Sequence, residues 1–405
     1  MKKKVSLLLA LAMVASLAAC GGGDAAESNK PAESAPAQSA AVSGDKVVRI
    51  GVFEPATGDS ASGGKKETLG MQYAHFETPT VDINGETYTV ELVTADNGST
   101  TDKAPSAAAD LVSKDVALVL GSYGSGVSIA ASDTFANAGL AAIGVTCTNP
   151  NVTAGNDHYF RICFLDPFQG TVLANFAKDK FSATTAYLLG EQGNEYDQGL
   201  IAFFKQAFEA AGGKTITDSF PTNNSDFTSY LNKAKSEGAQ VIFTPVSIAY
   251  ATQIISQAAS LGMDIPFVGS DTLDDNKVLE AANGTNIQLY VSTFYQEGGN
   301  PTFDEGVKNY INTNAQAKTD NGGDDTISAV TAMGYDAYYV ALEALKAAGS
   351  ADKAAVKAAL PNVTYTGVSG AIAFDATGDA VRDTAYIKHS TNTGAWELET
   401  VQTAK

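Results

Sequence analysis

From Lys46 onward, the chain alternates short runs rich in β-branched residues with longer stretches of helical spacing. The predicted strands of this first part are VVRIGVF (47–53), TYTVELVTADN (87–97), VALVLGS (116–122), LAAIGVT (140–146) and HYFRICF (158–164). Between them lie helical patterns at 66–78, 104–114 and 126–139. Strands joined through helices need right-handed crossovers, so this order predicts an α/β lobe with a mostly parallel sheet.

The same alternation restarts after LDPFQG (165–170) and predicts a second lobe. Its predicted helices are 171–181, 199–212, 226–238 and 249–262, and its predicted strands are 184–190, 214–220, 239–246, 265–271 and 287–295. An amphipathic helix at 335–349 and a hairpin or turn-bounded strand at 369–379 follow. Open α/β sheets bind ligands outside the carboxyl ends of their strands, so two facing lobes predict a cleft.

The N-terminus has the features of a secretory signal. Residues 1–19 combine a lysine-rich start with an apolar stretch shorter than the roughly 20 residues that a membrane span needs. Leu17-Ala18-Ala19-Cys20 is similar to a bacterial lipobox, which predicts lipidation of Cys20, and the alternative is ordinary cleavage beside an incidental cysteine. Residues 20–45 are small and polar and predict a flexible tether. We therefore expect an extracytoplasmic protein that is held at the membrane through its N-terminal lipid only.

Charge and composition limit the other partners. The formal net charge is −19, and loss of Lys2, Lys3 and Lys4 with the signal makes it −22. Such a surface repels phosphate backbones, which argues against nucleic acid. Three scattered histidines provide no metal-ligand spacing, and we expect no metal and no cofactor. Cys147 and Cys163 are left either to form a disulfide or to stay as two buried thiols.

The segment LVLGSYGSGVSIAAS (118–132) places three glycines and two serines between a strand and a helix. A Walker loop needs a lysine after the glycines, and a dinucleotide fingerprint needs the order G-x-G-x-x-G; neither is present. The remaining functional interpretation is a site for one small anion such as a carboxylate, with Ser125 donating its hydroxyl beside exposed amides. The alternative is that the glycines only make the turn and Ser125 only caps the helix.

Three further segments supply candidate residues. Thr146 and Thr148 follow the strand LAAIGV and can reach the same point as Ser125, or else Thr148 only stabilises the turn before Pro150. Asp271 follows IPFVGS and can bind a ligand ammonium, or else it caps the next helix. Tyr196 either closes over an aliphatic ligand or packs on the lobe surface.

These segments resemble extracytoplasmic solute-binding proteins of ABC importers, of the leucine/isoleucine/valine-binding type. The matching segments are VVRIGVFEPATG, GSGVSIAASD, TNP, YFRICFLD, NEYDQGL, FVGSD, GYDAYYVALEALKAAG and GAIAFDATGD. The resemblance implies a type I periplasmic-binding-protein fold, in which three crossing strands join two doubly wound, mostly parallel α/β lobes. It implies that lobe 1 comprises 46–166 plus about 296–375, and lobe 2 comprises 167–295 plus about 376–405.

By the same resemblance, Ser125 and Thr148 bind a ligand α-carboxylate with backbone help near Gly126 and Thr146, Asp271 binds the α-ammonium, and Tyr196 lines the cleft. The chain departs from the family near Gly63 and at Val246, where well-known relatives often have aromatic residues. Ser247 and Tyr250 follow Val246. The freed space is left either for a larger ligand side chain or for Tyr123, Phe294 or Tyr295 to fill.

The expected function is capture of an amino acid, branched-chain or a related aliphatic or aromatic one, by hinge closure, with delivery to ABC permease subunits. We expect the protein to act as a monomer. The alternative is a sensor or receptor subunit that uses the same cleft for a different small carboxylate or amide. An enzyme is not expected, because no G-x-S-x-G elbow or histidine-centred constellation is visible.

Overall fold

The structure is a computed structural model that describes residues 46–403. The predictions for the signal peptide 1–19, for Cys20 and for the tether to residue 45 lie outside the described residues. No helix within the described part combines the length and the apolar character needed to cross a membrane.

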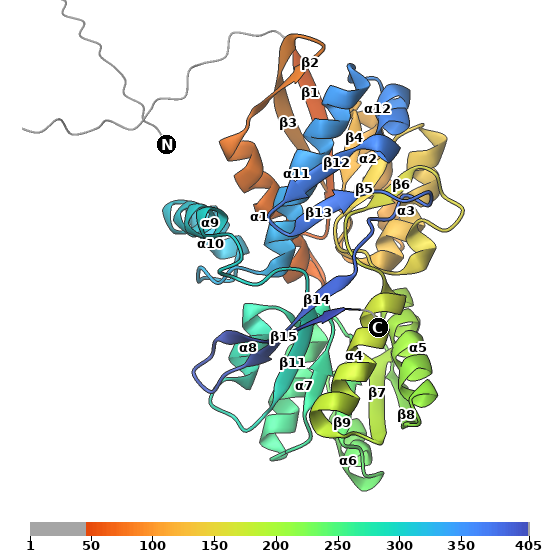
Figure 1. Ribbon diagram of the computed structural model, residues 1–405, viewed down its shortest axis with the longest axis vertical. Helices are drawn as coiled ribbons and strands as arrows, with labels where there is room; N and C mark the ends of the chain where they lie inside the picture. Colours follow the sequence, from red (N-terminus) through yellow and green to blue (C-terminus); the bar gives the residue numbers. More distant parts are fainter. Residues whose placement is uncertain (1–45, 404–405) are drawn as a thin grey trace, which may run out of the picture. The chain divides into compact units, whose positions relative to one another are not determined.

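A six-stranded sheet with the order β2-β3-β1-β4-β5-β6 forms the first lobe (Figure 1). Its strands are β1 (Val47–Glu54), β2 (Thr80–Ile83), β3 (Glu86–Asp96), β4 (Leu118–Leu120), β5 (Ala142–Gly144) and β6 (Tyr159–Arg161). All neighbouring pairs are parallel except β2 and β3, which form an antiparallel hairpin. The sequence analysis missed β2, although the Asn84-Gly85 pair after it is a hairpin signal.

Helices in the connections cover this sheet, and a later part of the chain returns to it. The elements are α1 (Ala61–Glu77), α2 (Ala104–Ser113), α3 (Ser125–Asn137), η1 (Pro150–Val152), α9 (Pro301–Thr313), α10 (Ala315–Asp320), α11 (Ala329–Ala348), α12 (Lys353–Ala359), η3 (Leu360–Asn362), β12 (Thr364–Gly367) and β13 (Gly370–Ala373). Helices α1 and α11 pack at close range, and glycines make this possible. A β-carbon on Gly70 would collide with the carbonyl of Thr331, and one on Gly334 with the carbonyl of Glu67. This approach fixes Glu67 beside the cleft.

The second lobe contains a seven-stranded sheet with the order β15-β14-β11-β10-β9-β7-β8. Its elements are α4 (Asp166–Phe181), β7 (Thr185–Glu191), α5 (Glu195–Ala210), β8 (Lys214–Phe220), α6 (Thr228–Ser236), β9 (Val241–Thr244), α7 (Ile248–Ser260), β10 (Phe267–Gly269), η2 (Asp271–Leu273), α8 (Asn276–Ala282), β11 (Leu289–Thr293), β14 (Thr384–Ser390) and β15 (Trp396–Thr403). Strands β7 to β11 pair in parallel, whereas β14 and β15 add an antiparallel edge. The sequence analysis did not predict that edge.

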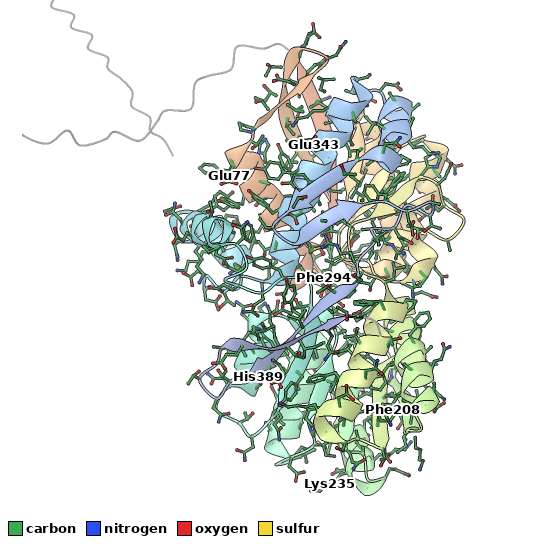
Figure 2. All side chains as sticks on the ribbon, viewed as in Figure 1. Glu77, Phe208, Lys235, Phe294, Glu343 and His389 are labelled. Atoms are coloured by element: carbon green, nitrogen blue, oxygen red, sulfur yellow. The ribbon has the colours of Figure 1, made fainter. Side chains whose placement is uncertain are left out.

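Three segments cross between the lobes, at 162–165, 294–300 and 374–383. Phe294 packs against Phe164 with ring centroids 4.1 Å apart, and Figure 2 shows Phe294 at the level where the lobes meet. The prediction of a strand over 158–164 was too long, because β6 ends at Arg161 and the following residues belong to a crossing. Two doubly wound, mostly parallel lobes with three connections confirm the predicted fold class.

Candidate ligand-binding site

A cavity of about 380 Å³ lies where loops at the carboxyl ends of strands from both sheets meet. This volume is within the range of small-molecule sites, about 300–1,000 Å³. Six of the nine predicted ligand residues line it, namely Tyr123, Ser125, Gly126, Thr146, Tyr196 and Ser247. The structure therefore brings together residues that are up to 124 positions apart in the chain, from Tyr123 to Ser247.

Ser125 is the first residue of α3 and is 2% exposed. The backbone N–H of Asn149 donates to its Oγ over 3.2 Å, which ties the β4–α3 loop to the β5–η1 loop. Gly124, not Ser125, is the N-cap of α3, so the prediction's alternative of a purely capping serine is wrong. An added β-carbon on Gly126 would make only ordinary contacts, with Thr101 at 3.6 Å and Glu195 at 3.9 Å. The positive end of α3 therefore opens on the cavity at a point where a small anion fits.

Thr146 and Thr148 lie at the end of β5. The hydroxyl of Thr146 donates to Glu67 Oε1, so its hydrogen is not free for a ligand carboxylate. Thr148 is fully buried, and its Oγ1 has no hydrogen-bond partner among the described residues. Thr148 does not line the cavity directly. Its carbonyl accepts from the N–H of Asp166 at the start of α4. A buried hydroxyl without a partner is costly, which makes Thr148 a group that a ligand or a water would satisfy.

Asp271 in η2 is 2% exposed, and it adjoins two residues that line the cavity, Thr272 in sequence and Tyr196 through a hydrogen bond. Gln169 Nε2 and the Tyr196 hydroxyl both donate to its Oδ1, over 2.6 Å and 2.8 Å. Within residues 46–403 its Oδ2 accepts no hydrogen bond. Burial raises the pKa of Asp271 to about 6, and the two donors limit the rise. The alternative of a helix cap is wrong, since Asp275 caps α8 by accepting from the N–H of Lys277.

Tyr123 occupies the space that the missing side chain at Gly63 leaves. A β-carbon on Gly63 would collide with the Tyr123 ring, and the hydroxyl of Tyr123 has no partner within the part of the chain that the structure describes. Tyr295 lies elsewhere: its hydroxyl donates to Asp304 Oδ1 over 2.6 Å, and its ring packs against Phe303 of α9. The expectation that Tyr295 contacts the ligand is therefore not supported by its position, because the crossing segment turns it toward α9.

Two buried glutamates beneath the cavity escaped the sequence analysis. Glu54 ends β1, and its Oε2 accepts from the N–H of Tyr123 over 2.7 Å. Glu67 in α1 accepts from Thr146. Burial, then the charge of Glu67, raises the pKa of Glu54, so the pair holds at least one proton near neutral pH. One sequence pattern could have pointed to Glu67: it shares a helical face with Gly63, Gly70 and Ala74, where an apolar residue is expected.

Two buried ion pairs also lie beside the site. Lys66 of α1 pairs with Asp275 of the second lobe over 2.6 Å, and Lys388 of β14 pairs with Asp274 over 3.0 Å. Burial alone would raise the pKa of Asp275, but the charge of Lys66 holds that pKa below its usual value. The Lys66 pair joins α1 to the start of α8 and thus connects the two lobes.

Cys147 and Cys163 are both buried free thiols, so the disulfide is not present. Burial raises the pKa of Cys147 to about 11, which keeps the thiol protonated and unreactive. Among residues 46–403, no group of three or more His, Cys, Asp or Glu side chains is arranged to hold a metal ion.

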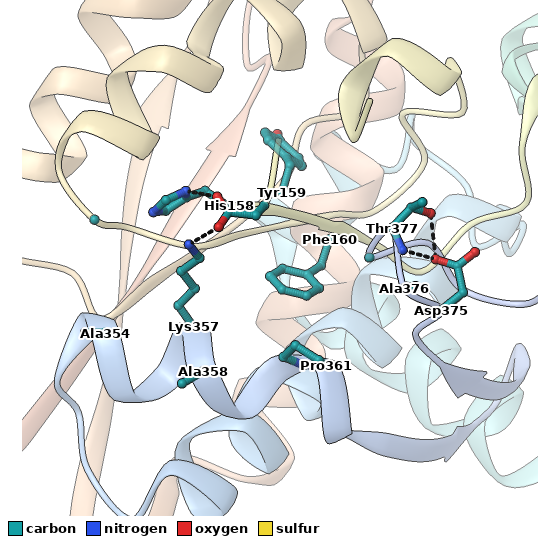
Figure 3. Close-up of a pocket in the computed structure, with 13 residues that line it drawn as sticks. His158, Tyr159, Phe160, Ala354, Lys357, Ala358, Pro361, Asp375, Ala376 and Thr377 are labelled. Carbon is teal, nitrogen blue, oxygen red and sulfur yellow. Dashed lines mark hydrogen bonds and ion pairs between the residues drawn. The ribbon is translucent and has the colours of Figure 1, made fainter. Parts of the chain in front are cut away.

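A larger cavity of about 560 Å³ lies in the first lobe, between the start of β6, helix α12 and the turn at 375–378 (Figure 3). Lys357 and His158 both pair with Asp157. Figure 3 shows Thr377 bonded to Asp375. None of the predicted ligand residues lines it. We therefore place the candidate site in the cavity between the strand ends and not here.

Comparison with known proteins agrees with this geometry. Residues 47–395 match the family model described as "Periplasmic binding protein". The chain is 29% identical over 337 residues to the Leu/Ile/Val-binding protein homolog 2 of Brucella abortus, which covers 82% of this chain and 87% of that protein. The crystal structure of a leucine-binding protein, LivK, from Thermotoga maritima superposes with a TM-score of 0.78 at 29% identity, over 88% of this chain and 98% of that one.

A second crystal structure, a solute-binding protein of an R. palustris ABC transporter in complex with benzoate, has a TM-score of 0.76 at 18% identity, over 88% and 96% of the two chains. At that identity the likeness shows the fold alone. The resemblance to the leucine/isoleucine/valine-binding type is confirmed by the relatives. Because the family model spans nearly all of the described residues, the chain belongs to the periplasmic binding protein family and has its type I fold.

Proposed function

We propose that the protein captures an amino acid in the cavity between its strand ends by closing its two lobes, and delivers it to an ABC importer. The observation that carries the proposal is the opposition of two kinds of group. In the first lobe, Ser125 at the positive end of α3 offers its hydroxyl, and Thr148 offers a hydroxyl that has no partner among the described residues. In the second lobe, Asp271 offers the carboxylate oxygen that Tyr196 and Gln169 leave unused. An α-amino acid has both a carboxylate and an ammonium, so one ligand can use both kinds of group.

Each charged end of the ligand would be held by buried groups. A carboxylate at the start of α3 gains from the helix dipole and from charge-assisted hydrogen bonds. An ammonium on Asp271 Oδ2 forms a charge-assisted bond worth roughly 1.5 to 3 kcal/mol. Since the two ends are bound by different lobes, the full set of contacts exists only when the lobes are closed.

The names of the relatives favour an aliphatic amino acid as the first candidate. More residues support binding of the ligand head group than support any particular ligand side chain. Tyr123 and Tyr196 supply the aromatic surface that this chain lacks at Gly63 and Val246. An affinity in the micromolar range, about −8 kcal/mol, is sufficient for uptake.

Delivery rests on the N-terminus as well as on the fold. The lipobox-like Leu17-Ala18-Ala19-Cys20 supports an extracytoplasmic protein anchored by lipid, with a tether to residue 45 that lets the binding unit reach permease subunits. In this proposal the ligand is released chemically unchanged.

A thermal-shift panel tests the proposal. The twenty amino acids and benzoate are each added at millimolar concentration to the wild type, to Asp271→Asn and to the matched control Asp264→Asn, an exposed acid of the same lobe. We expect at least one amino acid to raise the melting temperature of the wild type and of Asp264→Asn but not of Asp271→Asn. A response to benzoate alone would contradict the ammonium site, and no response to any amino acid would contradict the proposal.

A further inference from the structure

The cavity is strongly acidic. Five acidic residues line it, namely Asp59, Asp102, Glu191, Glu195 and Asp197. No Lys, Arg or His is present among its described lining residues. None of the five acids takes part in an ion pair within residues 46–403. The nearest lysine in sequence, Lys103, packs over Gly98 outside the lining.

Two of these acids line the cavity from opposite lobes. Asp59 precedes α1 in the first lobe, and Glu191 ends β7 in the second. Both residues line the same cavity, and partial burial, and then the charge of Glu191, raises the pKa of Asp59. Closing the lobes with nothing between these groups therefore costs electrostatic free energy.

Glu191 is held in place by uncharged donors. The Tyr250 hydroxyl lies 3.3 Å from its Oε1, and Asn194 Nδ2 donates to its Oε2 over 3.2 Å. Neither donor neutralises the carboxylate. The charge of Glu191 is thus positioned beside the cavity and left without a counter-ion.

Buried polar atoms without partners lie in the same lining. Asp197 is 1% exposed, and its Oδ2 accepts from the N–H of Glu191 over 2.7 Å, while its Oδ1 has no hydrogen-bond partner in the described structure. The hydroxyl of Tyr123 is also unpaired, with the residue 6% exposed. Such atoms lose free energy unless a donor or acceptor from a ligand reaches them.

We propose that the ligand is an amino acid whose aliphatic side chain ends in a cationic group, which binds between Asp59 and Glu191. The inference rests on the proposed function, since it takes the head group to be bound by Ser125, Thr148 and Asp271. An aliphatic stem lies against Tyr123, Val127 and Tyr196, and the terminal cation removes the repulsion between the two lobes. Closure is therefore favoured most by a ligand of this class.

Matched ligand pairs test the charge with little change in shape, since citrulline keeps the length of arginine and norleucine lacks only the terminal amine of lysine. L-arginine is compared with L-citrulline, and L-lysine with L-norleucine, by isothermal titration calorimetry on the wild type, Glu191→Gln, Asp59→Asn and the control Glu237→Gln. Glu237 is an exposed acid after α6 in the same lobe as Glu191. We expect each charged ligand to bind at least ten-fold more tightly than its neutral partner, and this ratio to fall toward one in Glu191→Gln and Asp59→Asn but not in Glu237→Gln.

The outcomes separate the two proposals. If norleucine or citrulline binds as tightly as its charged partner, or if the ratio is unchanged in Glu191→Gln and Asp59→Asn, the cation site is wrong and the amino-acid function stands. If neither member of either pair binds and leucine also fails, the proposed function itself is wrong. The melting temperatures of the three variants, measured without ligand, show whether each one is folded.

Discussion

The hydroxyl of Tyr196 donates to Asp271 Oδ1 over 2.8 Å, and the two residues come from different connections of the second sheet. Tyr196 lies in the first turn of α5 after β7, whereas Asp271 lies in η2 after β10. Together with Gln169, Tyr196 fixes one oxygen of the carboxylate and leaves the other for a ligand. This geometry is the basis of the first two predictions.

Asp271→Asn is expected to weaken amino-acid binding by about 10- to 100-fold, because a charge-assisted bond to the ligand ammonium is worth roughly 1.5 to 3 kcal/mol. Isothermal titration calorimetry measures the change, with Asp264→Asn as the control. The variant should fold, since an uncharged group at a buried position avoids the desolvation of the carboxylate. An affinity within two-fold of the wild type would contradict the ammonium assignment.

Affinity for a zwitterionic amino acid should fall at acidic pH. The pKa of Asp271 is raised to about 6 by burial, so the carboxylate that binds the ammonium is lost as the pH falls through 6. We expect roughly ten-fold weaker binding at pH 5 than at pH 7. Titrations across this range check the prediction, and Asp271→Asn should show a flatter profile. An affinity that is constant from pH 7 to pH 5 would argue against a role for this carboxylate.

The ligand-free protein should become more stable as the pH is lowered from 8 to 5. Asp166 is buried, and burial raises its pKa to about 7, so the folded state binds a proton over a range in which the unfolded chain has released it. Stability therefore rises as the pH falls through 7 and is lost as it rises. Asp271 acts in the same direction. Melting temperatures between pH 5 and pH 8 test the sign.

Asp166→Asn should remove part of this dependence. We expect it to raise the free energy of unfolding at pH 8 by on the order of 1 to 3 kcal/mol, since one pKa unit corresponds to about 1.4 kcal/mol. Asp179→Asn, an exposed change in the same helix, is the control. A melting temperature that increases steadily with pH in the wild type would show that the carboxyl groups are not protonated as described.

The ion pair between Lys66 and Asp275 should be important for stability, because both side chains are at most 2% exposed and they connect the two lobes. Lys66→Met leaves Asp275 buried without its partner, which typically costs about 3 to 5 kcal/mol. The double variant Lys66→Met/Asp275→Asn should recover part of the loss. Urea unfolding measures each variant against Lys65→Met, which changes the neighbouring, partly exposed lysine. Equal stability of Lys66→Met and Lys65→Met would show that the ion pair contributes little.

Cys20→Ser is expected to release the protein from the membrane, because the proposed anchor is a lipid on that cysteine. Membrane and soluble fractions are compared for this variant, for the wild type and for the tether control Ser28→Ala. Mass spectrometry of the wild type should show a mature chain that begins at Cys20 and carries a lipid. An unmodified N-terminus at another residue would contradict the anchor.

Much of the fold follows from local patterns. The alternation from 47–53 onward predicts parallel strands and their order along the chain, and the strand ends mark Ser125, Thr146 and Asp271 as candidates. The shortest and least regular elements were missed, such as β2 and the antiparallel edge of β14 and β15. Those strands are stabilised mainly by their neighbours, so their own residues give a weak signal.

The sequence by itself determined which residues stand at strand ends, because hydrophobic periodicity and turn residues are local properties of the chain. Only the tertiary structure decided which side chains converge. Glu67 reaches Thr146 because glycines allow α1 and α11 to approach closely, and Tyr123 lies over Gly63 because that glycine has no side chain. Asp59 and Glu191 line one cavity because the crossing segments bring two distant lobes together, and such long-range placement leaves no trace in local spacing.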